Sequence, residues 1–265
     1  MDELRVLIAG GGTGGHVIPA LAVGRELVSR YGAELLFVGT QRGMETRLVP
    51  EAGFQLRLID VGPLKNVSLL TRMKTLAALP SSILACRKLI REFKPGVVFG
   101  VGGYASGPAM AAALMMGVPA MAFEPNAMPG FANRLVGKRV QAAAVNFSSA
   151  ARWFRNAEVT GIPVRPEFFR LESPSGTAHL LVFGGSQGAR LFNNTLPQIV
   201  CALLDAVPGL TILHQCGARH IEATQAAYEA SGADPARWQV KAFLDDMAAR
   251  FAQAHLAMAR SGAST

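Results

Sequence analysis

Charged and aromatic residues are scarce in this 265-residue chain, at 17% and 7% of the total. Disordered chains and coiled coils need many more charged residues, so both classes are excluded. Cysteine is rare too: the three cysteines form no C-x-x-C pair, which excludes a disulfide framework and a zinc knuckle. The first residues also lack the basic start and long apolar core of a secretory signal. We therefore expect a globular protein of the reducing cytoplasm.

Two further absences narrow the range of partners. The sequence has no aromatic RNA-binding motif, no zinc-finger spacing and no basic recognition helix, so we expect no nucleic-acid partner. Residues 95–123 contain no charged residue, yet glycines together with Pro108 and Pro119 interrupt them before a membrane-spanning helix could form. This stretch instead reads as a strand, a glycine loop, a short buried helix and a second strand.

What the sequence has in plenty is short apolar runs that end in glycine. The helical spacing of residues 16–32, with Gly32 as the C-cap, follows the first of these runs, and the same plan of strand, glycine turn and helix recurs at residues 179–207. Runs that are apolar throughout are typical of parallel strands covered on both faces. We predict two doubly wound α/β sheets with strands at 5–10, 34–40, 96–103, 118–124, 142–147, 210–217, 238–243 and 255–260, besides the strand that opens 179–207.

The two predicted sheets imply two domains with different charge. A proline-rich and polar stretch at 159–176 places the boundary near Pro163, which gives domains at 1–162 and 163–265. Residues 1–163 hold 18 basic and 10 acidic residues, whereas the rest hold 8 of each. The first domain is therefore expected to face an anionic partner, either a phosphorylated substrate or a membrane surface.

Residues 10–15 satisfy the G-x-G-x-x-G pattern of dinucleotide sites. However, Gly39 and Thr40 end the next predicted strand, where a nicotinamide oxidoreductase needs an acid for the ribose. The physical expectation that survives is a phosphate or diphosphate held by backbone N–H groups at a helix start, with a plain packing turn as the alternative. Similar loops at 100–108 and 183–190 suggest phosphate-binding turns on both walls of one cleft.

Seven motifs in order resemble the signature blocks of the MurG family, the bacterial transferases that add N-acetylglucosamine to lipid I. They are GGTGGHVIPALAVG, GGYASGP, EPNAMPGFANR, GIPVR, GGSQGAR, HQCG and RSGAS. The resemblance implies the GT-B fold, in which two Rossmann-like domains face each other across a cleft. The second domain is expected to be incomplete, because members of the family continue beyond the point where this chain ends.

The resemblance also implies a reaction and a set of site residues. The 4-hydroxyl of the lipid-linked N-acetylmuramoyl-pentapeptide would attack the anomeric carbon of the sugar, expel UDP and form lipid II with inversion. The implied UDP-N-acetylglucosamine site consists of Thr13, Gly14, Gly15, Asn126, Arg165, Ser186, Leu244, Ala263, Ser264 and Thr265. The implied site for the acceptor diphosphate consists of Gly11, Gly12, Gly102, Gly103 and Tyr104.

Two residues are candidates for the catalytic base. His16 has a side chain whose ordinary pKa suits removal of a hydroxyl proton, although it could instead only orient the loop or the sugar. Glu124 is the rival, and the alternative for it is an acid that ties down a loop. The sequence has no D-x-D motif, and His214, Cys216 and His220 lack metal-site spacing, so we expect no metal and no cofactor.

A membrane contact is expected at residues 65–94. Leu69, Leu70, Met73, Leu76 and Leu79 approximate one helical face beside basic residues, although a core helix with a solvated basic edge fits the same spacing. The implied partners are UDP-N-acetylglucosamine, lipid I, an anionic membrane surface and, as candidates, other cell-wall synthesis proteins. The implied location is the cytoplasmic face of the plasma membrane, as a peripheral protein. An inactive binding module and a related glycolipid glycosyltransferase remain as alternatives.

Overall fold

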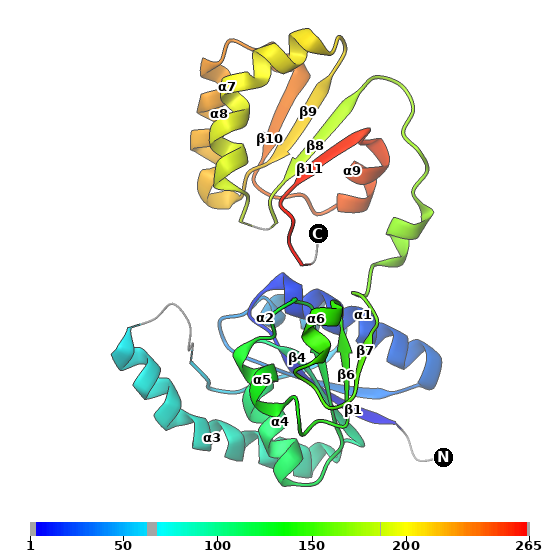
Figure 1. Cartoon of the computed structure of the whole chain (residues 1–265), viewed down its shortest axis with the longest axis vertical. Coiled ribbons are helices and arrows are strands. Elements are labelled where there is room, and N and C mark those ends of the chain that lie inside the picture. Colours follow the sequence, from blue (N-terminus) through cyan, green and yellow to red (C-terminus); the bar gives the residue numbers. More distant parts are fainter. Residues whose placement is uncertain (1–3, 63–67, 186, 264–265) are drawn as a thin grey trace. The chain divides into compact units, whose positions relative to one another are not determined.

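The computed structural model describes residues 4–62, 68–185 and 187–263. The chain divides into two compact units, of which the first ends at Val164 and the second begins at Arg165. Each unit is a parallel β-sheet with helices on both faces (Figure 1). The doubly wound α/β architecture predicted from the sequence is confirmed.

Within the described residues, the first unit has a seven-stranded sheet in the order β3-β2-β1-β4-β5-β6-β7. All neighbouring strands are parallel. The strands are β1 (Arg5–Gly10), β2 (Glu34–Gly39), β3 (Gln55–Leu58), β4 (Val97–Gly102), β5 (Ala120–Glu124), β6 (Ala142–Val145) and β7 (Ala157–Val159).

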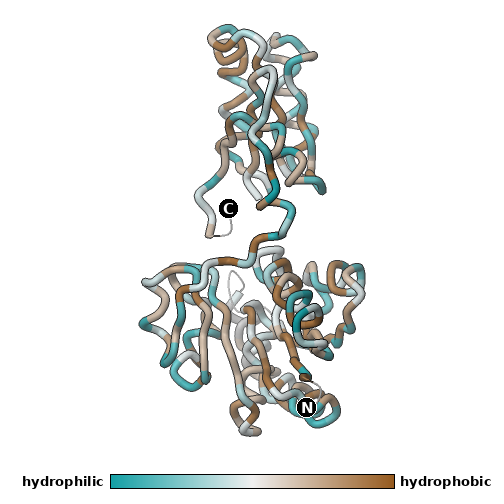
Figure 2. Tube along the Cα trace, turned by 90° about the vertical axis from the view of Figure 1, so that its right-hand side faces the viewer, coloured by the Kyte–Doolittle hydropathy of each residue, from teal (hydrophilic) through white to brown (hydrophobic). Residues whose placement is uncertain are grey.

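Successive residues of β1 point to opposite faces of the sheet and enter two separate cores. Val6 and Ile8 pack with helices α1 (Gly14–Tyr31) and α2 (Glu45–Glu51). Leu7 and Ala9 pack with the helices of the other face. These are α3 (Leu69–Phe93), α4 (Ser106–Met115), α5 (Phe131–Val136) and α6 (Ser148–Ala151). Along their length the helices mix hydrophobic and hydrophilic residues, as helices that cover a sheet do (Figure 2).

In the second unit, the described residues form a four-stranded parallel sheet in the order β10-β9-β8-β11. One face is covered by α7 and α8 and the other by α9 (Figure 1). The elements are η1 (Pro166–Arg170), β8 (His179–Phe183), α7 (Arg190–Ala206), β9 (Thr211–Gln215), η2 (Ala218–His220), α8 (Ile221–Ala230), η3 (Pro235–Arg237), β10 (Trp238–Lys241), α9 (Met247–Gln253) and β11 (Leu256–Ala259).

The expected apolar strands are all present, with ends shifted by a few residues. The first helix begins at Gly14 rather than at His16, so its glycines form the first helical turn. It ends as predicted at Gly32, which adopts the left-handed conformation with a φ of 62°. Strands β3 and β7 carry no apolar run that would predict them, because their residues are mostly exposed.

Helix α3 differs from the amphipathic face expected at 65–94. Its buried side chains are Thr75, Ser82, Cys86 and Ile90, whereas Met73, expected on the apolar face, is 61% exposed. Lys65 and the side chains of Leu69, Leu70, Arg72, Lys74 and Leu76 lie outside the described residues. The alternative of a core-packed helix therefore fits the C-terminal half of α3, where Ser82, Cys86 and Ile90 are buried.

His214, in β9, has its imidazole buried in the core of the second unit. The side chain is 1% exposed, and Nδ1 lies 3.2 Å from the Tyr228 hydroxyl, while Nε2 has no partner among the described residues. Burial lowers the pKa of His214 from its ordinary value of 6.5 to about 4. The folded unit therefore holds this histidine neutral at a pH where an unfolded chain would protonate it.

The buried His214 predicts acid sensitivity. Between pH 6.5 and 4 the unfolded chain binds a proton that the folded chain does not, so the free energy of unfolding should fall with pH, by roughly 3 kcal/mol at most. Urea unfolding followed by Trp238 fluorescence at several pH values measures this. His214→Phe should flatten the profile in that interval, and an unchanged slope in the variant would contradict the assignment.

Candidate active site

The candidate site lies where the winding of the first sheet reverses. Strand β1 leads into α1 on one face of the sheet, while its neighbour β4 leads into α4 on the other face. The turns that follow two such strands diverge and leave a crevice at the carboxyl edge of the sheet, where ligands of open α/β folds bind. The glycine loops at 10–15 and 100–108 are these two turns.

The two turns touch each other through glycines. Gly102 and Gly103 have φ values of 90° and 82°, in the left-handed region that favours glycine. The N–H of Gly11 donates to the carbonyl oxygen of Gly102 at 3.3 Å. A Cβ atom at Gly103 would overlap the carbonyl oxygen of Gly11, so only glycine allows this approach.

Two backbone N–H groups of the first turn already donate hydrogen bonds within the protein. Besides the bond from Gly11, the N–H of Gly12 donates to a carboxylate oxygen of Glu45 at 2.7 Å. The two amides that we expected at the acceptor diphosphate are therefore already bonded. In the described part of the chain, the N–H groups of Thr13, Gly14 and Gly15 have no acceptor, and they lie at the N-terminus of α1, where its dipole favours an anion.

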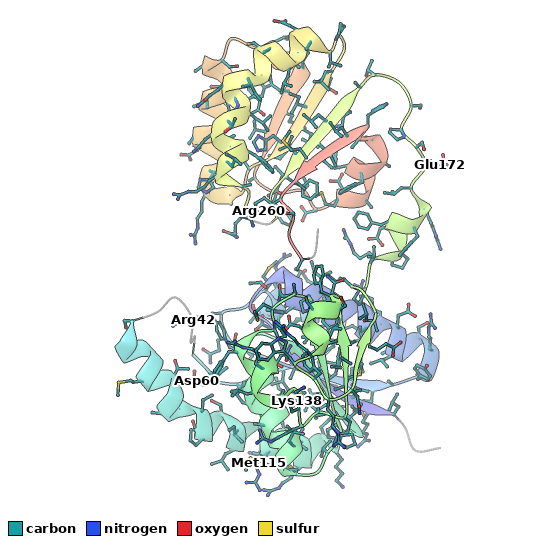
Figure 3. The ribbon with its side chains drawn as sticks, in the orientation of Figure 1. Arg42, Asp60, Met115, Lys138, Glu172 and Arg260 are labelled. Atoms are coloured by element: carbon teal, nitrogen blue, oxygen red, sulfur yellow. The ribbon has the colours of Figure 1, made fainter. Side chains whose placement is uncertain are left out.

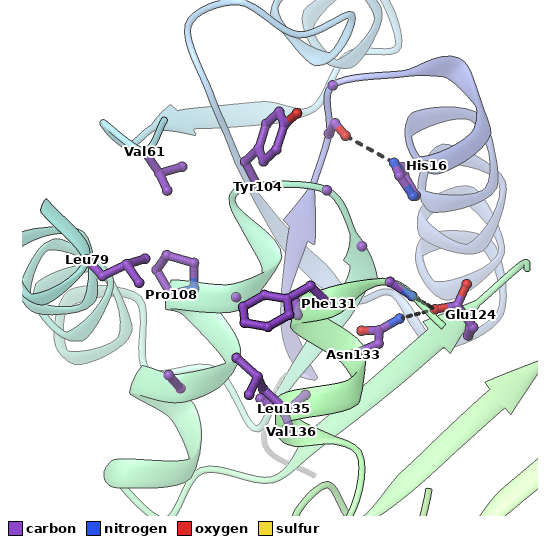
Figure 4. A pocket seen from close by; sticks show the side chains of 18 of the residues that line it. His16, Val61, Leu79, Tyr104, Pro108, Glu124, Phe131, Asn133, Leu135 and Val136 are labelled. Carbon is purple, nitrogen blue, oxygen red and sulfur yellow. Dashed lines mark hydrogen bonds between the residues drawn. The ribbon is translucent and has the colours of Figure 1, made fainter. Parts of the chain in front are cut away.

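His16 follows these free amides in the first turn of α1. Its Nδ1 lies 3.2 Å from the carbonyl oxygen of Gly11 and 3.4 Å from the hydroxyl of Thr13 (Figure 4). A Cβ atom at Gly102 would come within 3.0 Å of Nε2, so this nitrogen faces the second glycine turn. Burial lowers the pKa of His16, and the bond to Gly11 and the negative charges of Glu124 and Glu45 partly offset this.

Glu124 ends β5 and is 2% exposed. One carboxylate oxygen accepts the backbone and side-chain N–H groups of Asn126, each at 2.9 Å. The other accepts the N–H of Gly130 at 2.9 Å and the side chain of Asn133 at 3.0 Å. These bonds tie down the loop at 125–130, which is the alternative role considered for this acid.

A cavity of about 690 Å³ runs from the two glycine turns into the space between α3, α4 and α5. His16, Glu124 and the two glycine turns line its polar end, while the other end is mostly apolar (Figure 4). The apolar lining includes Leu79, Ile83, Pro108, Leu114, Phe131 and Leu135. Met115, at the end of α4, also lines it and is 65% exposed (Figure 3). The site thus joins a polar end with free helix amides to an apolar surface.

Sequence reasoning missed Glu45. This residue begins α2 and is 1% exposed, and its carboxylate accepts the N–H and the hydroxyl of Thr40 at 2.8 and 3.0 Å besides the N–H of Gly12. The only local signal was the glycine content around it, because Gly39 and Gly43 leave the room that its side chain fills.

The glycine turn of the second unit follows β8. Gly185 and Gly188 have φ values of 80° and 71°, and a Cβ atom at Gly188 would overlap the carbonyl of Cys216. The side chain of Asn193, in the first turn of α7, donates to that same carbonyl at 2.9 Å. This packing holds the turn at the carboxyl end of its strand, as predicted for a third glycine corner.

The remaining residues expected at UDP-N-acetylglucosamine come from both units, and three of them lie outside the described residues. Arg165 forms an ion pair with Glu167 at 3.4 Å and lies over the ring of Phe168. Leu244 is 9% exposed and packs in a hydrophobic cluster under α9. Asn126 lines the cavity of the first unit, and Ala263 is partly exposed. Ser186, Ser264 and Thr265 lie outside the described residues.

The described residues form neither a metal-binding cluster nor a membrane-spanning helix. They contain no group of three or more histidine, cysteine, aspartate or glutamate side chains placed to hold a metal ion. None of their helices is long and apolar enough to span a membrane.

Comparisons with known proteins agree with this geometry. Residues 6–145 match the glycosyltransferase family 28 N-terminal domain, and residues 179–265 match its C-terminal domain. The chain is 42% identical, over 99% of its length and 70% of the relative's, to the UDP-N-acetylglucosamine--N-acetylmuramyl-(pentapeptide) pyrophosphoryl-undecaprenol N-acetylglucosamine transferase of Anaeromyxobacter sp. (strain Fw109-5). It is 44% identical to the transferase of the same name from Solibacter usitatus, over 98% and 71% of the two lengths.

A solved structure supports the same assignment. The crystal structure of Acinetobacter baumannii MurG superposes with a TM-score of 0.75 and 31% identity, over 98% of this chain and 74% of that one. The two parallel α/β sheets are those of a glycosyltransferase with the GT-B fold. Within that class, the chain belongs to glycosyltransferase family 28 and, inside it, to the MurG family.

Proposed function

We propose that the protein transfers N-acetylglucosamine from UDP-N-acetylglucosamine to the 4-hydroxyl of lipid I and thereby forms lipid II for peptidoglycan. The relatives that support this proposal carry that transfer in their names. The observation that carries it here is the position of His16, between free helix amides and an apolar cavity. An anionic diphosphate with a lipid chain is the kind of acceptor that such a corner suits.

The proposed reaction is a direct displacement. The acceptor hydroxyl oxygen forms a bond to C1 of N-acetylglucosamine, while the bond from C1 to the β-phosphate oxygen breaks and UDP leaves. Nε2 of His16 takes the hydroxyl proton, because Nδ1 is bound to the carbonyl oxygen of Gly11. Glu124 keeps its place as a positioning residue for the loop at 125–130, since both of its oxygens are bonded.

The acceptor diphosphate is proposed to bind the free amides of Thr13, Gly14 and Gly15, beside Gly103 and Tyr104 of the second turn. The family resemblance implied these three residues at UDP-N-acetylglucosamine instead, but Gly11 and Gly12, implied for the diphosphate, already donate to Gly102 and Glu45. The lipid chain would then leave along the apolar walls of the cavity toward the membrane. The excess positive charge of residues 1–163 supports peripheral attachment to the anionic cytoplasmic face of the plasma membrane. UDP-N-acetylglucosamine is proposed to bind at the second unit, beside the turn after β8.

The apolar end of the cavity offers a test on the lipid. Leu135 lines the cavity and is 57% exposed, so Leu135→Asp should fold but repel an alkyl chain. We expect the KM for a long-chain lipid I to rise about tenfold or more, with little change for an analogue whose chain is too short to reach Leu135. Val28→Asp on α1, an exposed site in the other layer, is the matched control. Equal effects on both acceptors would contradict the proposed path of the lipid.

Transfer itself is tested with UDP-N-acetylglucosamine that carries a radioactive sugar, together with lipid I. The proposal expects label in the lipid fraction and release of one UDP for each sugar transferred. Binding of both substrates without transfer would instead support the reading of an inactive binding module. Transfer of label to diacylglycerol, with none to lipid I, would favour the glycolipid glycosyltransferase.

A further inference from the structure

Glu45 and His16 bind opposite ends of one peptide unit. The peptide bond between Gly11 and Gly12 carries the Gly11 carbonyl and the Gly12 N–H. The N–H donates to Glu45 at 2.7 Å, and the carbonyl oxygen lies 3.2 Å from Nδ1 of His16. We propose that Glu45 is a positioning residue for His16, which acts through this peptide unit to hold the imidazole with its proton on Nδ1.

The tautomer follows from the chemistry of the carbonyl. A carbonyl oxygen can only accept, so its bond to His16 requires a proton on Nδ1 and leaves the lone pair of the neutral ring on Nε2. A carboxylate at the N–H end draws the peptide dipole in the direction that makes the carbonyl oxygen a stronger acceptor. Glu45 thus stabilises the tautomer that can remove a proton from the acceptor.

The surroundings of Glu45 show that its side chain is built into the turn. A Cβ atom at Gly11, Gly39 or Gly43 would overlap this side chain, so three glycines from three segments enclose it. Its three hydrogen-bond donors come from Gly12 and Thr40. A carboxylate held in this way cannot turn toward solvent and leave the peptide unit without its partner.

A second carboxylate also acts on His16. Glu124 approaches from β5 and, like Glu45 from α2, favours the protonated ring. Arg139, which follows α5, and the hydroxyl of Tyr104 line the same cavity. The effect of Glu45 must therefore be separated from theirs by substitution at Glu45 alone.

The test is NMR of the chain labelled with ¹⁵N-histidine, in which long-range proton–nitrogen correlations show which ring nitrogen carries the proton. His16→Ala assigns the signals of His16. In the wild-type chain we expect the Nδ1–H tautomer at alkaline pH, whereas unrestrained histidine favours Nε2–H. In Glu45→Gln we expect a severalfold fall in the Nδ1–H population and protonation of His16 at lower pH.

Glu51→Gln is the matched control, because Glu51 ends the same helix, is exposed and pairs with Arg47. It should leave the spectrum of His16 unchanged. The Nε2–H tautomer in the wild-type chain would overturn the proposal, as would an unchanged His16 spectrum in folded Glu45→Gln. If that variant does not fold, the chemical shift of the Gly12 amide proton in the wild-type chain decides. A downfield shift, caused by the carboxylate of Glu45, supports the proposal, and an ordinary shift overturns it.

This inference rests on the proposed role of His16 as the base, yet the two can fail separately. Transfer that survives in His16→Ala would remove the proposed base, while the NMR spectrum could still show Glu45 holding the ring. A wrong tautomer alongside an inactive His16→Ala would remove the role of Glu45 and keep the base.

Discussion

Replacement of His16 by alanine is expected to lower the rate of sugar transfer by about 10²- to 10⁴-fold, the usual contribution of a general base. The acceptor hydroxyl would then have to lose its proton to water. Because the ring touches the Gly11 carbonyl through one bond and is not part of a hydrophobic core cluster, the variant should stay folded. Initial rates with saturating lipid I measure the loss of transfer. Calorimetric titration with UDP-N-acetylglucosamine separately measures whether the variant still binds the donor.

His255→Ala is the control for this experiment, since His255 precedes β11 at the amino edge of its sheet. It should keep the wild-type rate. The pH profile adds a second check: kcat/KM should fall on the acid side as His16 becomes protonated, and this acid limb should be missing from the residual activity of His16→Ala. Residual activity within tenfold of wild type would show that His16 only orients the loop or the sugar.

Gly103→Ala is expected to have the largest effect on folding. The residue has a φ of 82°, which an alanine adopts only with strain. The added methyl group would also overlap the carbonyl oxygen of Gly11, which is the atom that holds His16. We expect a loss of roughly 3–5 kcal/mol in the free energy of unfolding, and loss of transfer in whatever fraction remains folded.

Gly117→Ala separates the strain from the overlap. Gly117 has a φ of 70°, but no atom lies within 4 Å of a Cβ placed there. This control should cost only about 1–2 kcal/mol and leave transfer intact. Urea unfolding of both variants gives the comparison, and equal losses would show that the contact between the two glycine turns is not tight.

The fold could be predicted wherever strands are buried on both faces. Strands β1, β2, β4, β5 and β6 appear in the sequence as apolar runs, because parallel strands with helices above and below need apolar residues at every position. Strands β3 and β7 carry Arg57 and Glu158 and lie at the two edges of the sheet, where exposure removes the pattern. Edge strands of this kind can be assigned only from the folded structure, where their hydrogen-bonded neighbours are known.

The backbone turns of the candidate site and its buried acid Glu124 could be predicted from the sequence, whereas Glu45 could not. Glycine turns at the ends of strands are local features, so the turns at residues 10–15 and 100–108, and the place of His16 at the end of the first turn, followed from the sequence. The approach of His16 to Gly102 did not. The bond between Glu45 and Gly12 joins residues 33 positions apart and depends on how α2 packs against the turn. No local spacing indicates a carboxylate that points inward from the first residue of a helix.

The order of strands in the first sheet also has a consequence for how the chain folds during synthesis. Strand β1 emerges first from the ribosome, but its neighbour β4 begins roughly 90 residues later. At about 5–20 residues per second, one edge of β1 stays open for roughly 5–20 s. During that interval the apolar residues Val6, Leu7 and Ile8 lack their final neighbours along this edge, which favours wrong strand pairing in the nascent chain.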